Sequence, residues 1–502
     1  MSDNANLFSL IEAQFPADGN SACIITQQGV PYSWNDLQQA TAKLANLLAS
    51  LNLPKGARIV SHVDKSVEAL LLYLATLRAG YIFVPMNTAY QTAEMHYFIQ
   101  DAQPSVVVCS PTNFGWVAQL AFQLGCDHVF TLDDTLPNQG SLLQRAAPLS
   151  SEFKTVHSPP DDIAAIIYTS GTTGKSKGAM LSHGNLSSNA FALQTAWQWQ
   201  ASDVLLHCLP LFHVHGLFIS CHVALLSGSK LIFLPKFDAQ KALAFMDQST
   251  VFMGVPTYYV RLLEQAELTR ERCHSIRLFI SGSAPLLTET FYAFQQRTGH
   301  TILERYGMSE TNIICSNPCQ GERKAGTVGR ELTGQQVRIV NDKEQPCDVE
   351  DVGHIEVNGP NVFKGYWNNP EKTALEFTAD GFFKTGDMGK LDNDRYLNIV
   401  GRNKDLIISG GYNIYPKEIE LLLDALPGVV ESAVIGIPHN DFGEAVCAVL
   451  VCNKPVNTEQ LVVTLKTQIA NFKVPKKIVV VDELPRNSMG KVQKNVLRAQ
   501  FS

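Results

Sequence analysis

The residues with the clearest capacity for chemistry lie at 168–178, where the chain reads Tyr-Thr-Ser-Gly-Thr-Thr-Gly-Lys-Ser-Lys-Gly. Apolar residues run into this stretch at 163–167 and follow it at 179–181. We therefore expect a loop between two buried strands. Its glycines allow the backbone to approach a ligand closely, and its hydroxyls, amide hydrogens and lysines can surround oxyanions. The stretch predicts a loop that holds a polyphosphate.

The stretch is not an ordinary P-loop. That motif needs Gly, four residues and then Gly-Lys-Ser/Thr at the start of a helix. Five positions after Gly171 stands Ser176, and the pattern leads into a strand. The plain alternative is a flexible Gly/Ser/Thr linker, but the two lysines and the tight apolar flanks argue against it.

The same stretch resembles the signature of the adenylate-forming enzymes, which include acyl-CoA synthetases, luciferases and peptide-synthetase adenylation domains. The usual signature has Pro before the final Lys-Gly, where this chain has Ser176. We expect this difference to change the stiffness of the loop more than its chemistry. The resemblance implies a catalytic role for Thr172 and binding of the ATP phosphates by Thr169, Ser170, Gly171, Thr172, Thr173, Gly174, Lys175 and Lys177.

Two further motifs of the family follow in order. Gly-Ser-Ala-Pro at 282–285 resembles the adenine-facing loop, although this tetrapeptide alone is a weak signal. Tyr-Gly-Met-Ser-Glu at 306–310 resembles the segment that places an aromatic ring against adenine and an acid on magnesium. Magnesium needs few protein carboxylates when phosphate oxygens also bind it, so Glu310 alone would suffice. The alternative is that Glu310 is a solvated glutamate after a tight turn. The resemblance assigns the nucleotide contacts to Ser283, Ala284, Pro285, Tyr306, Gly307, Met308 and Ser309.

The remaining motifs lie near the expected domain junction and at the end of the chain. Thr-Gly-Asp at 385–387 resembles the ribose clamp, although an Asp after Gly is usually a turn residue. Arg402 would add a ribose contact, and Lys404 occupies the hinge position. Ser409, Gly410 and Gly411 offer a backbone without side-chain bulk for a narrow thiol channel. Lys491, in a Gly-Lys tip, matches the family's catalytic lysine, which reaches the reacting carboxylate.

The acid substrate is predicted from two cationic positions. The run 205–216 carries His207, His213 and His215, whose spacing is not that of a zinc site on a helix. A satisfied core histidine is the default reading for each, except that His213 matches a segment near the family's carboxylate site. Arg305 stands where relatives that use fatty or aromatic acids usually have a small residue. An arginine fork suits a second carboxylate, whereas pairing with Glu304 or another acid at a loop is the structural alternative.

Taken together, these segments most resemble malonyl-CoA synthetases within the family. The implied reaction joins malonate, with methylmalonate as an option, to coenzyme A through an acyl-AMP, releasing AMP and pyrophosphate. ATP and coenzyme A are substrates, and Mg²⁺ is the implied cofactor. Three alternatives stay open: a short-chain acyl-CoA synthetase of other specificity, an adenylating ligase that loads a carrier-protein thiol, and a catalytically silent nucleotide-binding homologue. A luciferase is weaker, since nothing points to an oxygenation pocket.

The elements that must position these residues follow an alternating pattern. Strands are expected at 58–63, 81–85, 104–109, 128–132, 251–256 and 276–281, and near the end of the chain at 433–437, 445–451 and 478–481. Helices are expected at 66–78 and from about 458 to 470, and a capping box of Ser33 and Asp36 precedes a further helix. Such alternation predicts parallel sheets covered on both faces. The resemblance implies an α/β fold with a large N-terminal domain of layered β-sheets and flanking helices, residues 1–401. A small, mobile α+β C-terminal domain, residues 402–502, follows it.

Composition narrows the class of protein. The 502 residues are 45% hydrophobic and 17% charged, which is typical of a globular protein. A net charge of −7 argues against nucleic acid as a partner. The sequence contains no run of 18 apolar residues, so it predicts no membrane span. The first twenty residues lack Lys and Arg, unlike a targeting peptide, and the eleven scattered cysteines indicate reduced thiols in the cytoplasm. The oligomeric state stays open, with a monomer among the options.

Overall fold

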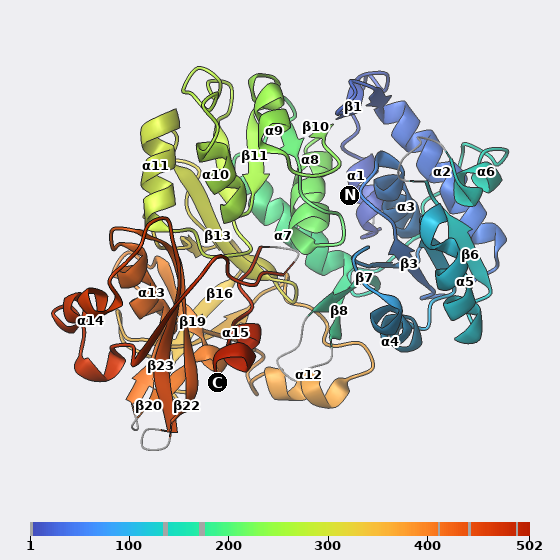
Figure 1. The fold of residues 1–502 in the computed structure, drawn as a ribbon. Coiled ribbons are helices and arrows are strands. Elements are labelled where there is room, and N and C mark those ends of the chain that lie inside the picture. Colours follow the sequence, from blue (N-terminus) through green and yellow to red (C-terminus); the bar gives the residue numbers. More distant parts are fainter. Residues whose placement is uncertain (1–3, 134–138, 170–175, 410–411, 440–442, 488–489) are drawn as a thin grey trace.

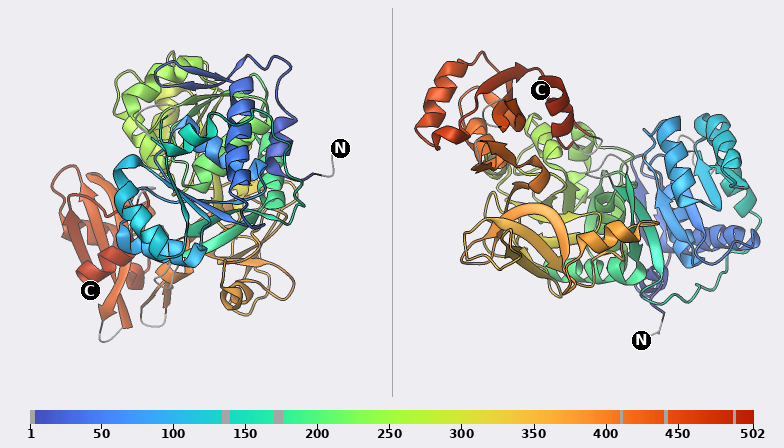
Figure 2. Two further views of the ribbon diagram at one scale, coloured as in Figure 1. Left: turned by 90° about the vertical axis from the view of Figure 1, so that its right-hand side faces the viewer. Right: turned by 90° about the horizontal axis from the view of Figure 1, so that it is seen from below.

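The computed structural model describes residues 4–133, 139–169, 176–409, 412–439, 443–487 and 490–502. Within these residues the strands form four sheets, three in the large domain and one in the C-terminal domain (Figure 1). The alternation of strands and helices in the first half of the sequence is confirmed. Figure 2 shows the C-terminal domain, in orange-red to red, as a lobe distinct from the rest of the molecule.

The largest sheet has nine strands and is parallel across its centre. Its order is β15 (Arg330–Glu331), β14 (Asn312–Ser316), β13 (Ile302–Met308), β12 (Leu278–Ser281), β11 (Val251–Gly254), β9 (Val204–His207), β10 (Lys230–Phe233), β1 (Ala22–Thr26) and β2 (Pro31–Ser33). The helices that connect or follow these strands include α8 (His222–Leu226), α9 (Ala239–Phe245), α10 (Pro256–Leu263) and α11 (Thr288–Thr298). The strand expected from 276 begins two residues later, at Leu278.

The second sheet contains the two strands that flank the stretch predicted to hold phosphate. Its order is β6 (His128–Thr131), β5 (Val106–Cys109), β3 (Arg58–His62), β4 (Ile82–Pro85), β7 (Ile163–Thr169) and β8 (Lys177–Ser182). β7 and β8 pair antiparallel, with Thr169 opposite Lys177, so the two strands predicted on either side of the stretch are confirmed. Other helices of this half are α1 (Leu7–Glu12), α4 (Thr92–Ala102), α5 (Phe114–Gln123), α6 (Ser141–Ala146) and α7 (His183–Ala196).

Two helices show how local sequence produces this layering. In α3 (Val67–Arg78) every residue is buried, because the helix is apolar on nearly all sides and lies in the interior of the large domain. In α2 (Trp34–Ser50) the predicted capping box is present: the Ser33 hydroxyl accepts from the N–H of Asp36, whose carboxylate accepts from the N–H of Ser33. This exchange satisfies two amide donors that the first helical turn leaves unpaired.

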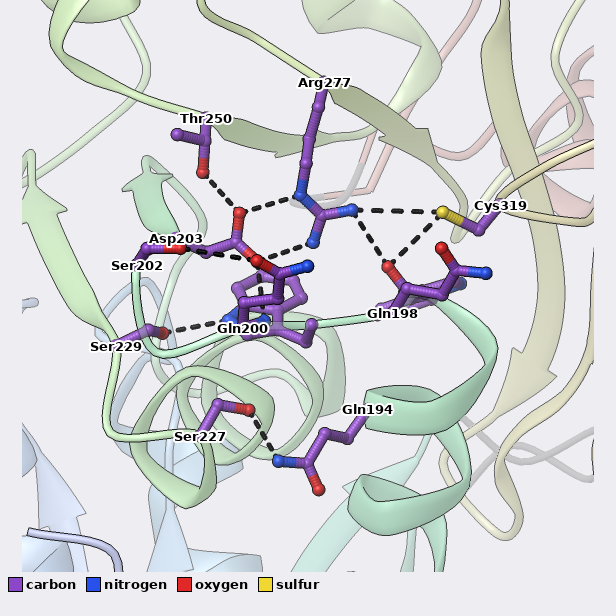
Figure 3. A network of polar contacts seen from close by, with 12 residues as sticks. Gln194, Gln198, Gln200, Ser202, Asp203, Ser227, Ser229, Thr250, Arg277 and Cys319 are labelled. Carbon is purple, nitrogen blue, oxygen red and sulfur yellow. Dashed lines mark hydrogen bonds and ion pairs between the residues drawn. The ribbon is translucent and has the colours of Figure 1, made fainter.

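An ion pair joins the N-terminal ends of β9 and β12 in the nine-stranded sheet (Figure 3). The Arg277 guanidinium donates from Nε to Oδ1 of Asp203 over 2.7 Å and from Nη2 to Oδ2 over 2.6 Å. Thr250 donates to the same carboxylate over 2.7 Å, and Arg277 also donates to the Trp197 carbonyl over 3.0 Å. These bonds connect three neighbouring strands to the end of α7.

The third sheet was not anticipated from the sequence. It is antiparallel, in the order β16 (Gln336–Val340), β17 (Gly353–Asn358), β18 (Phe383–Leu391) and β19 (Leu397–Arg402), and α12 (Pro370–Glu376) precedes β18. It ends at Arg402, where a short 3₁₀ turn, Asn403–Asp405, leads into the C-terminal domain.

The C-terminal domain is an α+β unit with its own core. Its sheet contains β21 (Tyr412–Ile414), β20 (Ile407–Ser409), β23 (Gly443–Cys452), β22 (Val429–His439) and β24 (Lys477–Val481), with helices α13 (Pro416–Asp424), α14 (Thr458–Lys466) and α15 (Lys494–Phe501). The helix expected to reach 470 stops at Lys466. Two apolar clusters here draw only on residues 407–501, whereas the three clusters of the large domain draw only on residues 7–399.

Candidate active site

Thr169 and Glu310 come together from two different sheets. Thr169 ends β7, and its hydroxyl donates to Oε1 of Glu310 over 3.4 Å. Tyr366 donates to the same oxygen over 3.1 Å. Burial raises the pKa of Glu310, and none of the ion pairs among the described residues neutralises this carboxylate. A buried acid held only by hydroxyls is a fitting ligand for a divalent cation that would neutralise it.

Lys177 lies on the other side of Tyr366. Its ammonium is 4.7 Å from the centre of the Tyr366 ring and 4.0 Å from Oε1 of Glu376. Burial, followed by the neighbouring Lys372, lowers the pKa of Lys177. The ammonium of Lys177 is only weakly neutralised by its neighbours, so an anionic ligand bound beside it would be stabilised. The other predicted phosphate contacts, Ser170, Gly171, Thr172, Thr173, Gly174 and Lys175, lie outside the described residues.

The predicted ribose residues form one cluster. The Tyr306 hydroxyl donates to Oδ2 of Asp387 over 2.6 Å, and Nε of Arg402 is 3.0 Å from Oδ1 of the same carboxylate. Asp387 and Arg402 also face each other in register on β18 and β19. Burial, with the carboxylate beside it, raises the pKa of the Tyr306 phenol well above its ordinary value. The motifs at 306, 387 and 402 are therefore adjacent in space.

Lys491 lies beside this cluster although it belongs to the C-terminal domain. Burial, followed by the charge of Arg402, lowers the pKa of Lys491 to about 8, and Asp387 partly offsets this effect. The Lys491 backbone exchanges hydrogen bonds with Asn487, whose side-chain oxygen accepts from the Lys491 N–H over 2.9 Å. The preceding Gly490 lies against Thr257 on α10 of the large domain. The lysine loop is thus docked on the large domain.

The second cluster contains Arg305 and two histidines. Arg305 is buried, and its Nε and Nη2 atoms have no hydrogen-bond partner among the described residues. The same holds for Nε2 of His213 and Nε2 of His215, while Nδ1 of His215 lies 3.2 Å from the Ser283 hydroxyl. Burial lowers the pKa of Arg305 to about 9 and that of His213 to about 4. An unpaired buried guanidinium is costly, so this arrangement favours an anionic ligand.

The alternative pairing of Arg305 with Glu304 is wrong. Neighbouring residues of β13 point to opposite faces of the sheet. Glu304 Oε1 accepts from the Leu286 N–H over 3.1 Å, and burial raises the pKa of Glu304 to about 7. No ion pair joins Glu304 and Arg305 among the salt bridges of the described residues.

The three histidines of 205–216 differ in environment. His207 is a satisfied core residue: Lys65 Nζ lies 2.6 Å from its Nδ1, and its Nε2 lies 2.8 Å from the Gly216 carbonyl. His213 ends the preceding turn, and a buried π-helical turn, His215–Cys221, begins just after it. Such turns occur often at functional sites. The default reading is therefore right for His207 and incomplete for His215.

The other predicted residues occupy turns and edges around these clusters. Ser283 has a left-handed backbone, with φ of 71°, and is partly buried, as is Ala284, whereas Pro285 is exposed. Gly307 fits where a Cβ would stand 1.8 Å from the Asn312 carbonyl oxygen, so the β13–β14 hairpin requires glycine there. Met308 ends β13, and Ser309 lies in the turn that follows.

The hinge and channel residues lie at the domain junction. Lys404 lies in the 3₁₀ turn with much of its side chain exposed, and partial desolvation of its amine, followed by the charge of Arg402, lowers its pKa. Ser409 is buried at the end of β20, whereas Gly410 and Gly411 lie outside the described residues. Beside Lys404, Asp405 Oδ1 accepts from Nη2 of Arg498 on α15 over 2.7 Å.

Sequence reasoning missed two residues of these clusters. Tyr366 binds Glu310 and covers Lys177, yet it stands in a Gly-Tyr-Trp stretch with no chemical pattern of its own. His215 was given the core reading, although its position two residues after His213 was a usable signal. Both residues reach their sites through tertiary contacts between distant segments.

Comparison with known proteins identifies the family. The family model for AMP-binding enzymes matches residues 11–367, and the model for the AMP-binding enzyme C-terminal domain matches residues 418–491. The chain therefore belongs to the AMP-binding enzyme family.

Its relatives include a malonate–CoA ligase of Arabidopsis thaliana, 34% identical over 99% of this chain and 89% of that protein. A mitochondrial malonate–CoA ligase of Bos taurus is 34% identical over 97% of this chain and 89% of its own. The ATP-bound crystal structure of MatB from Rhodopseudomonas palustris is 50% identical, covers 99% of both chains and has a TM-score of 0.97. The apo structure of that protein has a TM-score of 0.87.

No helix in the described part of the chain is both long and apolar enough to cross a membrane.

Proposed function

We propose that this protein is an ATP-dependent acid–thiol ligase that converts malonate, ATP and coenzyme A to malonyl-CoA, AMP and pyrophosphate by way of malonyl-AMP. One observation carries the choice of acid: among the described residues, the buried Arg305 has no hydrogen-bond partner for Nε and Nη2, and the same holds for Nε2 of His213 and of His215. A dicarboxylate keeps one negative charge after its other end is adenylated, and this pocket would neutralise it. The named activity of the Arabidopsis and Bos relatives supports the same choice.

In the first half-reaction a malonate carboxylate attacks the α-phosphorus of ATP, the new oxygen–phosphorus bond forms and pyrophosphate leaves. Two anions must approach each other, so the protein contributes mainly positioning and charge compensation. Lys491 would hold the attacking carboxylate, while Asp387 and Arg402 hold the ribose with Tyr306 beside them. Thr169, the stretch 170–175 and Lys177 would hold the β- and γ-phosphates, and the adenine would lie against the segments 283–285 and 306–309.

Mg²⁺ fits the site formed by Glu310 and Thr169. When bound, the ion would offset the negative charge that develops on the phosphate oxygens. Glu310 would act as its protein ligand, with Thr169 and Tyr366 orienting the carboxylate. The described residues contain no group of three acidic, histidine or cysteine side chains placed to hold a metal, which fits an ion that depends on phosphate oxygens.

In the second half-reaction the thiol of coenzyme A attacks the acyl carbon and AMP leaves. Lys491 occupies the ribose side of the site, so it must move away before the thiol can enter. We propose that residues 1–401 and 402–502 are the two domains and that the second rotates about Lys404, a hinge motion of a common kind. Ser409, Gly410 and Gly411 would then line the thiol channel. The higher TM-score against the ATP-bound MatB than against the apo form supports an adenylation-state arrangement here.

The proposal also covers location and partners. The eleven free cysteines favour a reducing compartment, and we propose the cytoplasm. The partners would be the small molecules malonate, ATP and coenzyme A, without nucleic acid. The competing function, a ligase that loads a carrier-protein thiol, predicts activity with a carrier protein rather than with free coenzyme A.

The test is an AMP-release assay with ATP, Mg²⁺ and coenzyme A across acetate, malonate, methylmalonate, succinate and octanoate. The proposal expects the highest kcat/KM with malonate. Preference for octanoate or acetate would overturn the choice of acid, and AMP release that requires a carrier protein would overturn the choice of thiol.

A further inference from the structure

Gly282 lies directly beside the buried guanidinium of Arg305. β12 and β13 are parallel neighbours, with Ile280 opposite Leu303 and Ser281 opposite Glu304. The next position in this register places Gly282 beside Arg305. The Arg305 side chain therefore crosses the backbone at a position that has no side chain.

A Cβ atom at this position would collide with the guanidinium. Built on the Gly282 backbone, it would lie 2.4 Å from Cζ, 2.5 Å from Nε and 2.6 Å from Nη1 of Arg305. Non-bonded carbon atoms are normally about 3.5–4.0 Å apart. A side chain at 282 and the observed position of the guanidinium thus exclude each other.

The backbone itself does not require glycine at 282. Gly282 is absent from the glycines with a left-handed φ, and its N–H donates to the Gly254 carbonyl over 3.3 Å as in an ordinary strand. Each of the three nearest atoms belongs to Arg305, so the collision is with a movable side chain rather than with main chain. Alanine at 282 would therefore fold, and the guanidinium would have to move by about 1 Å or more to reach normal contact.

Little else holds the guanidinium in place. Its Nε and Nη2 atoms lack partners among the described residues, and Glu304 faces the other side of the sheet. Arg305 therefore owes its position to shape rather than to hydrogen bonds. Once displaced, the guanidinium would not be drawn back to its observed position by hydrogen bonds from the described residues.

From this geometry we propose that Gly282 is a positioning residue that sets acid specificity: by lacking a Cβ it provides the space in which Arg305 meets the second carboxylate. The inference rests on the proposed function. Gly282 touches no substrate in this account and acts only through Arg305. A displacement of about 1 Å in a positioned group can cost about a hundredfold in rate.

The experiment is pyrophosphate exchange by the full-length Gly282→Ala variant with malonate and with propionate. kcat/KM for malonate should fall about 30- to 100-fold, mainly through a higher KM for malonate. In the same variant, the KM for ATP and the kcat/KM for propionate should each differ from the wild-type values by less than about threefold. Gly115→Ala, a substitution with open space around the new Cβ and an ordinary φ, serves as the matched control and should leave all parameters unchanged.

A double-mutant cycle with Arg305→Ala separates positioning from general damage. Because the two residues act as a unit, Gly282→Ala in the Arg305→Ala background should cost nothing further with malonate. The double variant should be at least as thermally stable as Gly282→Ala alone, because Arg305→Ala removes the side chain that collides with the new Cβ. A poorly folding Gly282→Ala variant would therefore still give a decisive result. Additive losses, or an equal loss with both acids together with a raised KM for ATP, would overturn the inference. If wild-type protein itself does not prefer malonate, the proposed function fails, which is a separate outcome.

Discussion

The side chain of Arg402, the last residue of β19, is paired with Asp387, with 3.0 Å between Nε and Oδ1. Tyr306 donates to the other oxygen of that carboxylate, and Lys491 lies within electrostatic reach of both charges. The proposed hinge residue Lys404 follows two positions later. The proposed ribose site, the proposed catalytic lysine and the proposed hinge therefore occupy one small region, and a rotation at Lys404 would remove Lys491 from the site.

Lys491→Ala should separate the two half-reactions. If Lys491 acts only in adenylation, the variant should lose malonate-dependent pyrophosphate exchange by at least about two orders of magnitude, as expected for loss of a positioned cation. It should largely retain the conversion of supplied malonyl-AMP and coenzyme A to malonyl-CoA. Equal losses in both assays would contradict the rotation. Lys466→Ala, at an exposed position in the last turn of α14 of the same domain, is the control.

The pH dependence of adenylation should show the lowered pKa of Lys491. The ammonium form holds the carboxylate, so kcat/KM for malonate in pyrophosphate exchange should fall as the pH rises through about 8. This limb reports the free enzyme. Conversion of supplied malonyl-AMP does not use Lys491, and its profile should lack the same limb. A limb common to both half-reactions would assign the titration to another group.

Lys404→Pro should trap one arrangement of the domains. Proline fixes φ near −65° and so prevents a large backbone change at this position. Adenylation should persist while thioester formation from malonyl-AMP is blocked, and a thermal melt should exclude a folding defect. Normal rates in both half-reactions would place the hinge elsewhere.

Arg277→Met should destabilise the large domain without touching the site. Asp203 is buried, and although burial raises its pKa, the hydrogen bonds from Arg277 and its neighbours hold the pKa below its ordinary value. Leaving a buried carboxylate unpaired costs about 3–5 kcal/mol, and we expect about 2–4 kcal/mol because Arg277 is partly exposed. This contribution is present above about pH 4, the usual unfolded-state pKa, and is lost as the pH falls through the lowered folded-state pKa.

The measurement is the denaturant midpoint of the large domain. Arg272→Met, which removes the exposed pair of Arg272 with Asp247, should cost only about 0–1 kcal/mol. Equal effects of the two variants would show that the Asp203 network adds no more than a surface ion pair.

Local pattern was sufficient for much of the fold. The buried strands around the loop 170–175, the Ser33 capping box and the strands of the C-terminal domain follow from apolar periodicity and capping residues. The antiparallel sheet β16–β19 was missed because β17 and β18 are largely buried while β19 is mostly half-buried, so its strands share no single alternating pattern. The family motifs singled out Glu310, Asp387 and Lys491 as predicted site residues, whereas the roles proposed for Tyr366, His215 and Gly282 depend on contacts between segments far apart in sequence.

The most direct test of the account is the acid preference of Arg305→Ala, measured by pyrophosphate exchange with malonate and with propionate. Truncating one partner of a buried charge pair costs about 2–5 kcal/mol, which is about 30- to 4,000-fold in relative affinity. We expect kcat/KM for malonate to fall by about two orders of magnitude or more within that range, while propionate changes far less. Arg305→Lys should fall between wild type and Arg305→Ala, since it keeps the charge without the fork, and the exposed Arg330→Ala should have no effect. A uniform loss with both acids would make Arg305 structural, and a malonate preference that survives Arg305→Ala would contradict the central claim.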